Sequence, residues 1–263
     1  MLPRADLLKG SQRTEGLSQL IDLAEQALRT WEPCWSGFLE AELQEEAQQR
    51  LGELSELQLM SDGGWPHAER CRLLFRRAAL VDDPAAPPPA VALRGLVVSG
   101  NFLFDPAEPS DVRQGLRLVD LEASELGDIW MRGDRGAQAV ISEAAAARCE
   151  GLETHVRSVP VRLQVVPLDH LQWPAGRTPR QVSSVEASLR LDAVASAGMG
   201  ISRSRMTALI RSGAVRVNWQ VITSPSRELN CGDRVRLDGR GELEILAIQP
   251  TKRDRWRLVM QRR

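Results

Sequence analysis

Two proline-rich stretches constrain the fold of this chain more than any other feature, because they divide it into segments. They are "DDPAAPPPA" at 82–90 and "QWPAGRTP" at 172–179. Proline has no amide donor and fixes φ, so neither stretch can continue a helix, and both are expected to form extended connectors. Domains are therefore predicted at 1–81, 91–171 and 180–263. A chain of 263 residues with 43% hydrophobic content suits several modest cores rather than one large core.

The first segment is dominated by helical periodicity. In "LSQLIDLAEQALRTW" the apolar residues recur at spacings of three and four, which places them on one helix face. A second, acidic helix is predicted for "FLEAELQEEAQQRLGEL". In "GGWPHAERCRLLFRRA" a Gly-Gly-x-Pro turn precedes a stretch that we interpret as a third helix. Residues 1–81 are therefore expected to form a helical N-terminal domain with little strand.

The middle segment alternates strand and helix patterns in the order βαββαβ. "ALRGLVVSG", "GDIWMRG", "GAQAVIS" and "VRLQVVPL" are strand candidates. "SDVRQGLRLVDLE", capped by Ser110 or Asp111, and "EAAAARCEGLE" are helix candidates. This order is the ferredoxin-like split arrangement of many RNA-recognition (RRM-like) domains, although the fold serves many functions. The third strand candidate, Gly136–Ser142, has no aromatic residue, so base stacking on the sheet face is not expected.

Two helices feeding a small sheet are predicted for the third segment. "SLRLDAVASAG" forms the first helix, with Asp192 in its first turn, where a carboxylate suits the helix dipole. "SRSRMTALIRSG" forms the second, with Ser202 as its N-cap and Gly213 as the residue that ends it. "AVRVNWQVI" and "CGDRVRL" supply strands. The whole chain is accordingly assigned to the α+β class.

Charge is segregated between this third segment and the rest of the chain. Residues 178–263 carry 16 Lys and Arg against 8 Asp and Glu, a net charge of +8, whereas residues 1–177 carry 18 against 27, or −9. No carboxylate occurs between Asp192 and Glu228. A basic module predicts a polyanion partner. Nucleic acid is favoured, since a membrane would require a basic amphipathic helix with an exposed apolar face.

Arginines surround the start of the second helix of this module. At about 100° per residue, Arg211 points away from the apolar side while Arg203 and Arg205 flank it, and Arg216 follows on the next strand. Free amides at a helix N-terminus favour an anion, and arginines beside them add charge-assisted contacts to phosphate. We expect these arginines and Ser202 to bind a nucleic-acid backbone. A solvated helix face that keeps the domain soluble would show the same charges, so charge alone leaves both interpretations open.

The residues of the module resemble the S4 RNA-binding domain. "LRLDAVASAGMGISRSRMTALIRSGAVRVNWQVITSPSRELNCGDRVRL" contains, in order, an Arg-Leu-Asp helix start, a Ser-Arg pair, Ile-x-x-Gly, a Val-x-Val-Asn strand and a late Gly-Asp turn. It departs from the family at Trp219, where glycine usually follows Val-Asn. A bulky ring there could block close backbone approach or add a stacking surface. The resemblance implies an RNA-facing surface made by Arg190, Asp192, Ser202, Arg203, Thr207, Arg211, Arg216 and Asn218.

Three further segments extend the resemblance over most of the chain. "GGWPHAER", "VRQGLRLVDLEASELGDI" and "TKRDRWRLVMQR" resemble the signature, the Leu-Gly-Asp-Ile segment and the basic C-terminal hairpin of the YlmH family. The Asn-Trp pair is similar to cyanobacterial and plastid members labelled photosystem II S4 domain proteins. The resemblance implies a ribosome-associated RNA-binding protein with an RRM-like middle domain, whose bacterial relatives act on stalled large subunits carrying peptidyl-tRNA. The implied partners are large-subunit rRNA and tRNA, and a monomer is expected.

No enzyme site is expected. "VRLDGRGEL" around Asp238 imitates the catalytic motif of pseudouridine synthases but lacks the following Thr/Ser-x-Gly-Leu. An S4-containing RNA-modifying enzyme is therefore only an alternative, as is a photosynthesis-specific interaction role. No P-loop or GxGxxG motif follows a strand. No metal or other cofactor is expected, because no CxxC occurs and the cysteines lie far apart, at Cys34, Cys71, Cys149 and Cys231.

Residues within the signature leave two interpretations open. Glu69 and Arg70 could form a buried ion pair or face RNA, and His67 is expected to be structural or exposed.

The N-terminus lacks the apolar run of a signal peptide, and no segment approaches the ~20 apolar residues of a membrane span. A cytoplasmic location is therefore expected.

Overall fold

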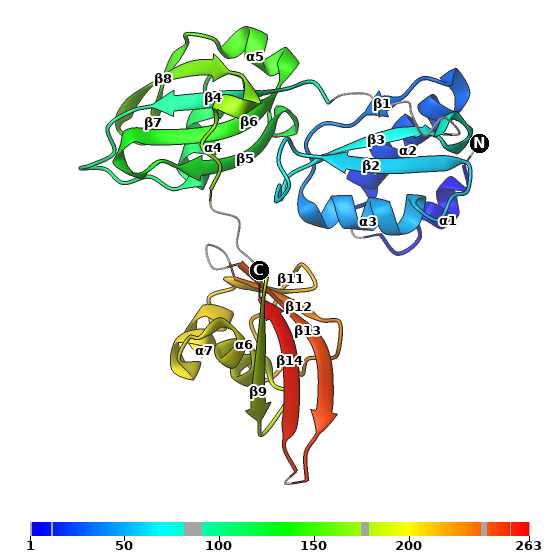
Figure 1. The fold of residues 1–263 in the computed structure, drawn as a ribbon, viewed down its shortest axis with the longest axis vertical. Coiled ribbons are helices and arrows are strands. Elements are labelled where there is room, and N and C mark those ends of the chain that lie inside the picture. Colours follow the sequence, from blue (N-terminus) through cyan, green and yellow to red (C-terminus); the bar gives the residue numbers. More distant parts are fainter. Residues whose placement is uncertain are drawn as a thin grey trace. The chain divides into compact units, whose positions relative to one another are not determined.

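The chain divides into two compact units, Met1–Pro174 and Ala175–Arg263, each described here by itself. Among the helices of the described residues, none is both long and apolar enough to cross a membrane. The predicted connector at 82–90 and residues 175–178 of the second connector lie outside the described residues. In this computed structural model (Figure 1) the described residues are 2–11, 13–81, 91–174, 179–237, 241–252 and 254–262.

Helices and a three-stranded sheet form the N-terminal part of the first unit. Helix α2 (Thr14–Thr30) buries Leu17, Ile21 and Ala24 against the sheet, as its periodicity predicts. The sheet has the order β1-β3-β2, so β3 is its central strand. The other elements are α1 (Arg4–Leu8), β1 (Cys34–Trp35), α3 (Ala41–Leu51), β2 (Leu57–Asp62), β3 (Arg72–Arg77) and the 3-10 turn η1 (Ala78–Val81).

The expectation of a third helix in "GGWPHAERCRLLFRRA" is wrong. Its second half forms β3, which pairs with β1 on one side and β2 on the other. Leu73 and Phe75 belong to the core beneath α2, and Leu74 is equally buried. A short apolar run fits a strand buried on both faces as well as a helix, and only its pairing partners decide. The N-terminal region is therefore mixed rather than helical, while the α+β class of the chain is confirmed.

The middle region has the predicted ferredoxin-like strand order with one added strand. The sheet order is β5-β6-β4-β8-β7, and every neighbouring pair is antiparallel. The added strand, β7, forms a hairpin with β8, which the sequence pattern missed. The elements are β4 (Leu93–Ser99), α4 (Pro109–Arg117), η2 (Ala123–Glu125), β5 (Leu126–Met131), η3 (Gly133–Arg135), β6 (Gly136–Ser142), α5 (Glu143–Cys149), β7 (Glu153–Val156), β8 (Val159–Val166) and η4 (Leu168–His170).

The first helix of this region is capped differently from the prediction. Its N-cap is Glu108 rather than Ser110 or Asp111, and Asp111 closes the capping box from the third helical position, where its Oδ2 accepts the Glu108 amide at 2.9 Å. Pro109 takes the first helical position, where the missing N–H costs nothing. The helix therefore starts earlier than the spacing of its apolar residues suggests.

The middle sheet is covered on both faces at β6, whereas β8 exposes Pro160, Arg162 and Gln164 on the face away from the helices. Helices α4 and α5 pack on one face, and all seven residues of β6 are buried. On the other face Phe38 from the N-terminal region packs with Val140 and Trp130. The contact is close enough that a Cβ at Gly127 would lie 2.8 Å from the Phe38 ring. Around Val140 and Trp130, the face on which RRM-like sheets stack bases is therefore filled by the protein's own side chains, which gives a physical reason to expect no base stacking on that part of the sheet.

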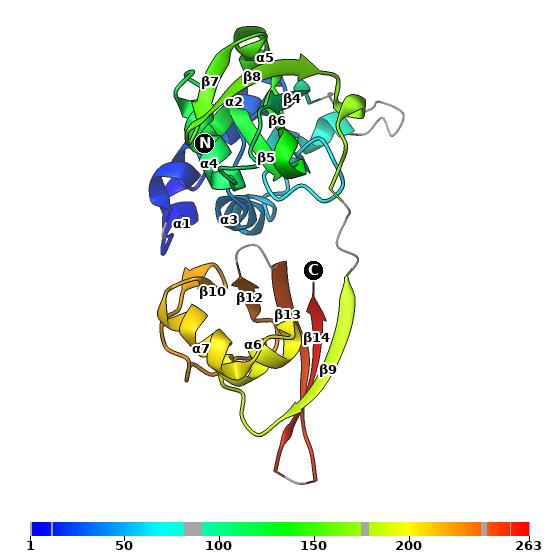
Figure 2. The same ribbon diagram turned by 90° about the vertical axis from the view of Figure 1, so that its left-hand side faces the viewer.

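The second unit is a six-stranded antiparallel sheet with two helices on one face (Figures 1 and 2). Its core joins Leu191 and Val194 of the first helix to Met206 and Ile210 of the second and to Val217 of the sheet. The predicted basic hairpin is present as the pair β13 and β14. The elements are β9 (Arg180–Glu186), α6 (Leu191–Met199), α7 (Arg203–Arg211), β10 (Val215–Val217), β11 (Gln220–Val221), β12 (Arg234–Leu237), β13 (Gly241–Pro250) and β14 (Trp256–Arg262).

Candidate nucleic-acid interface

Helix α7 presents an exposed and well-capped N-terminus. Ser202 is the N-cap, and its Oγ accepts the Arg205 amide at 3.4 Å, as predicted. At the other end Gly213 takes φ +77, and the amides of Gly213 and Ala214 donate to Ile210 and Leu209, the Schellman pattern. Local residues thus define the helix at both ends. The solvent-facing first turn leaves its amide dipoles available to an anion.

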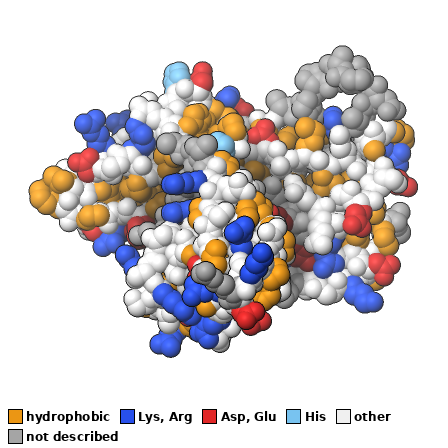
Figure 3. All heavy atoms as spheres, turned by 60° about the horizontal axis from the view of Figure 1, so that its bottom comes forward, with side chains coloured by type: hydrophobic (Ala, Val, Ile, Leu, Met, Phe, Trp, Pro, Cys, Tyr) orange, Lys and Arg blue, Asp and Glu red, His pale blue; other side chains and the backbone are white. Residues whose placement is uncertain are grey.

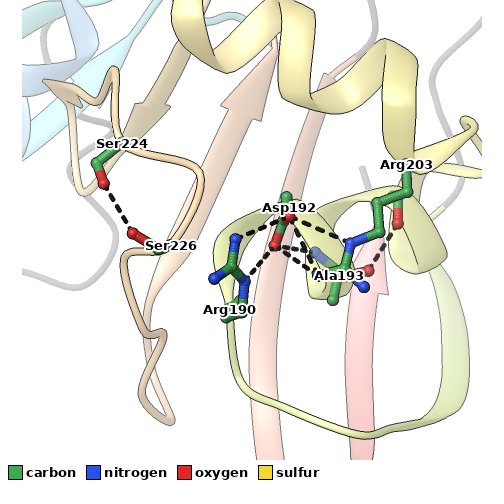
Figure 4. A network of polar contacts seen from close by, with 7 residues as sticks. Arg190, Asp192, Ala193, Arg203, Ser224 and Ser226 are labelled. Atoms are coloured by element: carbon green, nitrogen blue, oxygen red, sulfur yellow. Dashed lines mark hydrogen bonds and ion pairs between the residues drawn. The ribbon is translucent and has the colours of Figure 1, made fainter.

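Asp192 is a buried residue that binds two of the predicted arginines, Arg190 and Arg203. Its carboxylate is only 7% exposed, and it accepts hydrogen bonds from Arg190 Nε at 3.0 Å and from Arg203 Nε and Nη2 at 3.2 Å (Figure 4). Burial by itself raises the pKa of the Asp192 carboxyl, but the hydrogen bonds and charges of Arg190 and Arg203 together hold it below its ordinary value. The arginine side chains remain 39% and 56% exposed. Asp192 is therefore placed to orient the guanidinium groups, while the arginines face solvent.

We expect Asp192→Asn to lower the free energy of unfolding at pH 7 by about 1–2 kcal/mol, because one amide cannot hold two guanidinium groups. The folded pKa is depressed, so this stabilisation is complete above the unfolded pKa of about 3.9 and is lost as pH falls through the folded pKa. Urea unfolding at pH 7 and pH 3 should show the difference shrinking at low pH. Asp254→Asn, at an exposed position of the same unit, is the control and should change little.

The remaining predicted residues fall into two groups. Arg205 and Arg211 are exposed on α7, and Thr207 lies half-buried between them. Arg216 lies on β10, where Val215 and Val217 face the helices, so Arg216 points to the opposite face of the sheet. The structure therefore brings Arg190, Arg203, Arg205 and Arg211 to the helical side of the unit and separates Arg216 from them.

Asn218 has a structural role in the hairpin that joins β10 to β11. Its Nδ2 donates to Asp233 Oδ1 at 2.7 Å, and its Oδ1 accepts the Arg234 amide at 2.9 Å. Its φ of +48 suits asparagine, which tolerates the left-handed region. The next residue, Trp219, has its ring 5.5 Å from the Arg234 guanidinium carbon and 5.3 Å from that of Arg236. The sequence prediction missed both of these arginines, although alternation in "RVRL" places them on one face.

Charge on the second unit follows the predicted asymmetry. In Figure 3, Lys and Arg side chains predominate over Asp and Glu on the part of this unit that faces the viewer. The basic hairpin contributes Arg255 and Arg257, which are exposed. Such a surface attracts a polyanion over a range set by the salt concentration.

The "GGWPHAER" signature has a structural role in the first unit. Arg70 is 6% exposed, donates to the carbonyl oxygens of Leu126 and Ala123 at 2.9 and 2.7 Å, and forms an ion pair with Glu40. Arg70 is therefore buried, but its ion-pair partner is Glu40, whose side chain is 64% exposed, and not Glu69. Glu69 is exposed, and its backbone amide takes part in the network described next.

Asp128 of β5 completes this network. Its carboxylate accepts Trp65 Nε1 at 3.0 Å and the amides of Glu69 and Arg70 at 2.9 Å. Burial raises the pKa of the Asp128 carboxyl, although these three hydrogen bonds oppose the rise. The Trp65 ring stacks on the Trp173 ring with their centroids 5.6 Å apart. The exposed His67 ring lies edge-to-face with the Trp65 ring. The signature therefore joins the N-terminal sheet to the middle sheet.

The cysteines show no arrangement for metal or redox chemistry within the described residues. Each of them is a free thiol, and no cluster of His, Cys, Asp and Glu in the described ranges could hold a metal ion. Cys71 and Cys149 are buried, and burial raises the pKa of the Cys71 thiol to about 11. A thiol with such a pKa is a poor nucleophile at neutral pH.

Comparison with known proteins agrees with this layout. The family described as "YlmH, N-terminal" matches residues 12–80, and the S4 domain matches residues 189–235. The chain is 28% identical over 206 residues to "Ribosome-associated protein quality control protein P2" of Bacillus subtilis (strain 168), covering 78% of this chain and 77% of that protein. A solved structure, "Cell division protein ylmH from Streptococcus pneumoniae", is 17% identical with a TM-score of 0.46, covering 60% of this chain and 93% of that one. The two family models thus identify a YlmH N-terminal region at 12–80 and an S4 domain at 189–235, and the YlmH family is the one that this chain resembles.

Proposed function

We propose that this protein binds structured RNA through its S4 unit and associates with the large ribosomal subunit, contacting rRNA and tRNA in translation or ribosome quality control. The observation that carries the proposal is the exposed start of α7, where Asp192 binds Arg190 and Arg203 and the Arg203 guanidinium lies at the helix N-terminus. Arg205 and Arg211 extend the positive charge along the same helix. The name of the Bacillus subtilis relative supports the choice of the ribosome as partner.

Phosphate is the chemical group that this arrangement suits. A guanidinium fixed by a buried carboxylate loses little rotamer freedom when it binds, and its outer N–H groups match phosphate oxygens. The amides of the first turn add hydrogen bonds and the positive end of the helix dipole. These contacts position a protein on an RNA backbone without reading its sequence. The target would accordingly be chosen by RNA shape.

Sedimentation of a cell extract at low and high salt tests the proposed partner. The protein should travel with large subunits at low salt and be released at high salt, because screening weakens phosphate contacts. Recovery only at the top of a low-salt gradient, or with photosynthetic membranes and no RNA, would contradict the proposal and favour a photosynthesis-specific role.

We expect Arg203→Ala and Arg211→Ala each to weaken RNA binding without unfolding the protein, since both side chains are exposed. If each neutralises one phosphate, the slope of log affinity against log salt should fall by about one per substitution. Filter binding or fluorescence anisotropy over a salt series measures this slope. Unchanged affinity and slope in both variants would show that these arginines form a solvated helix face and do not bind RNA.

We further propose that the protein acts by binding and not as an enzyme. Asp238, the one aspartate in a pseudouridine-synthase-like context, lies outside the described residues. Incubation with rRNA followed by mapping of modified bases tests this point. Reproducible modifications that disappear with Asp238→Asn would assign an RNA-modifying activity instead.

A further inference from the structure

Trp219 lies in a backbone conformation that tryptophan does not favour. The hairpin between β10 and β11 has a two-residue turn, Asn218-Trp219, with φ of +48 and +69. This type I′ geometry favours asparagine followed by glycine, because a Cβ is strained at positive φ. Trp219 therefore costs conformational free energy that glycine would not. A strained residue at an exposed turn is a reason to look for a function of its side chain.

The surroundings of the ring are basic. Arg234 and Arg236 of β12 approach the indole within cation–π distance, and Arg216 lies directly across from Arg236 on β10. These three arginines lie on the sheet face opposite the helices, because Val215, Val217 and Val235 alternate with them and belong to the core. We call Trp219, Arg216, Arg234 and Arg236 the sheet-face cluster.

Carboxylates lie on one side of the sheet-face cluster. Glu242 and Glu244 of β13 are the register partners of Arg236 and Arg234, and Arg234 Nη1 lies 3.9 Å from Glu242. In the sheet order β11-β10-β12-β13 these carboxylates lie beyond β12, away from the turn that carries Trp219. The positive charge of the face is therefore concentrated toward Trp219. Beside the ring, β11 is an edge strand with Val221 54% exposed, so the turn is reached from solvent.

We propose that the sheet-face cluster is a second RNA-binding site, in which the Trp219 indole stacks on an unpaired base and the arginines contact the adjoining phosphates. An aromatic ring beside guanidinium groups is the combination that binds single-stranded nucleic acid, because every base has a π-face and every linkage a charge. The inference rests on the proposed RNA binding of this unit. It assigns a separate role to the face that the helix arginines do not reach, namely recognition of an unpaired nucleotide next to a structured element.

The test uses the full-length protein and two RNA hairpins that differ only in one unpaired purine beside the stem. Wild-type protein should prefer the hairpin with the unpaired base. Trp219→Gly should remove that preference, with about a tenfold loss of affinity for this RNA, as expected for one base stacked on an aromatic ring. Its melting temperature should be unchanged or higher, since glycine relieves the strain at φ +69. Trp219→Phe should retain part of the preference.

Trp31→Gly is a matched control. Trp31 also has a positive φ, +63, and has Arg77 over its ring at 4.1 Å, but it ends helix α2 in the other unit. Its replacement should leave both RNA affinities unchanged. A Trp219→Gly protein that keeps the wild-type preference, while Arg203→Ala still weakens binding, would overturn this inference alone. Failure of the wild type to bind either hairpin would overturn the proposed function as well. Loss of ribosome co-sedimentation without any change on either RNA would assign the ring to a protein partner and also overturn the inference.

Discussion

Arg70→Ala should lower the free energy of unfolding of the first unit by about 3 kcal/mol, because it removes one partner from a buried polar network. The carbonyl oxygens of Leu126 and Ala123 would lose their donor, and Glu40 would lose its ion-pair partner. Arg70→Lys should recover only part of this loss, since an ammonium group cannot reproduce the guanidinium fork. Urea unfolding followed by tryptophan fluorescence measures the effect, and Trp65 and Trp130 report on this region.

Arg94→Ala is the control for this substitution. Arg94 pairs with Glu143 at 2.6 Å, but both side chains are about half exposed, at 45% and 50%. Exposed pairs of this kind contribute at most about 1 kcal/mol. A similar small effect from Arg70→Ala would show that the contacts between the N-terminal and middle sheets do not depend on the signature arginine.

Simultaneous replacement of Arg203, Arg205 and Arg211 by alanine should reduce RNA affinity about a hundredfold or more at physiological salt. Removal of three phosphate contacts should lower the salt slope by about 2 to 3. The apolar side of α7 is untouched, with Met206 and Ile210 still in the core, so the fold should persist. Anisotropy measurements across a salt series, with circular dichroism to check folding, give both quantities.

A matched triple variant separates local contacts from net charge. Arg132, Arg135 and Arg162 are exposed on the middle region, and their replacement by alanine changes the total charge by the same amount. This variant should retain nearly all of the affinity and slope. Equal losses in the two triple variants would mean that RNA responds only to overall charge and that α7 holds no specific site.

Local sequence determined the elements whose boundaries depend on their own residues. Helix α7 begins directly after Ser202, whose hydroxyl accepts the Arg205 amide, and stops before Gly213, because glycine tolerates the positive φ that ends the helix. The strand order of the middle sheet follows from the βαββαβ succession, since few connections are possible between such elements. The charge asymmetry and the S4 and YlmH resemblances are likewise properties of the linear chain.

Tertiary structure decided every feature that depends on a distant partner. The three apolar residues of β3 fit a helix as well as a strand, and only pairing with β1 and β2 makes this segment a strand. Arg70 could have faced RNA, and only its contacts with residues 30 or more positions away along the chain show that it is buried. The Trp219 ring meets Arg234 and Arg236 through strand pairing, which no spacing rule for its own segment encodes. Periodicity reports which face of an element is buried, whereas the identity of the neighbour is set by packing between segments far apart in the chain.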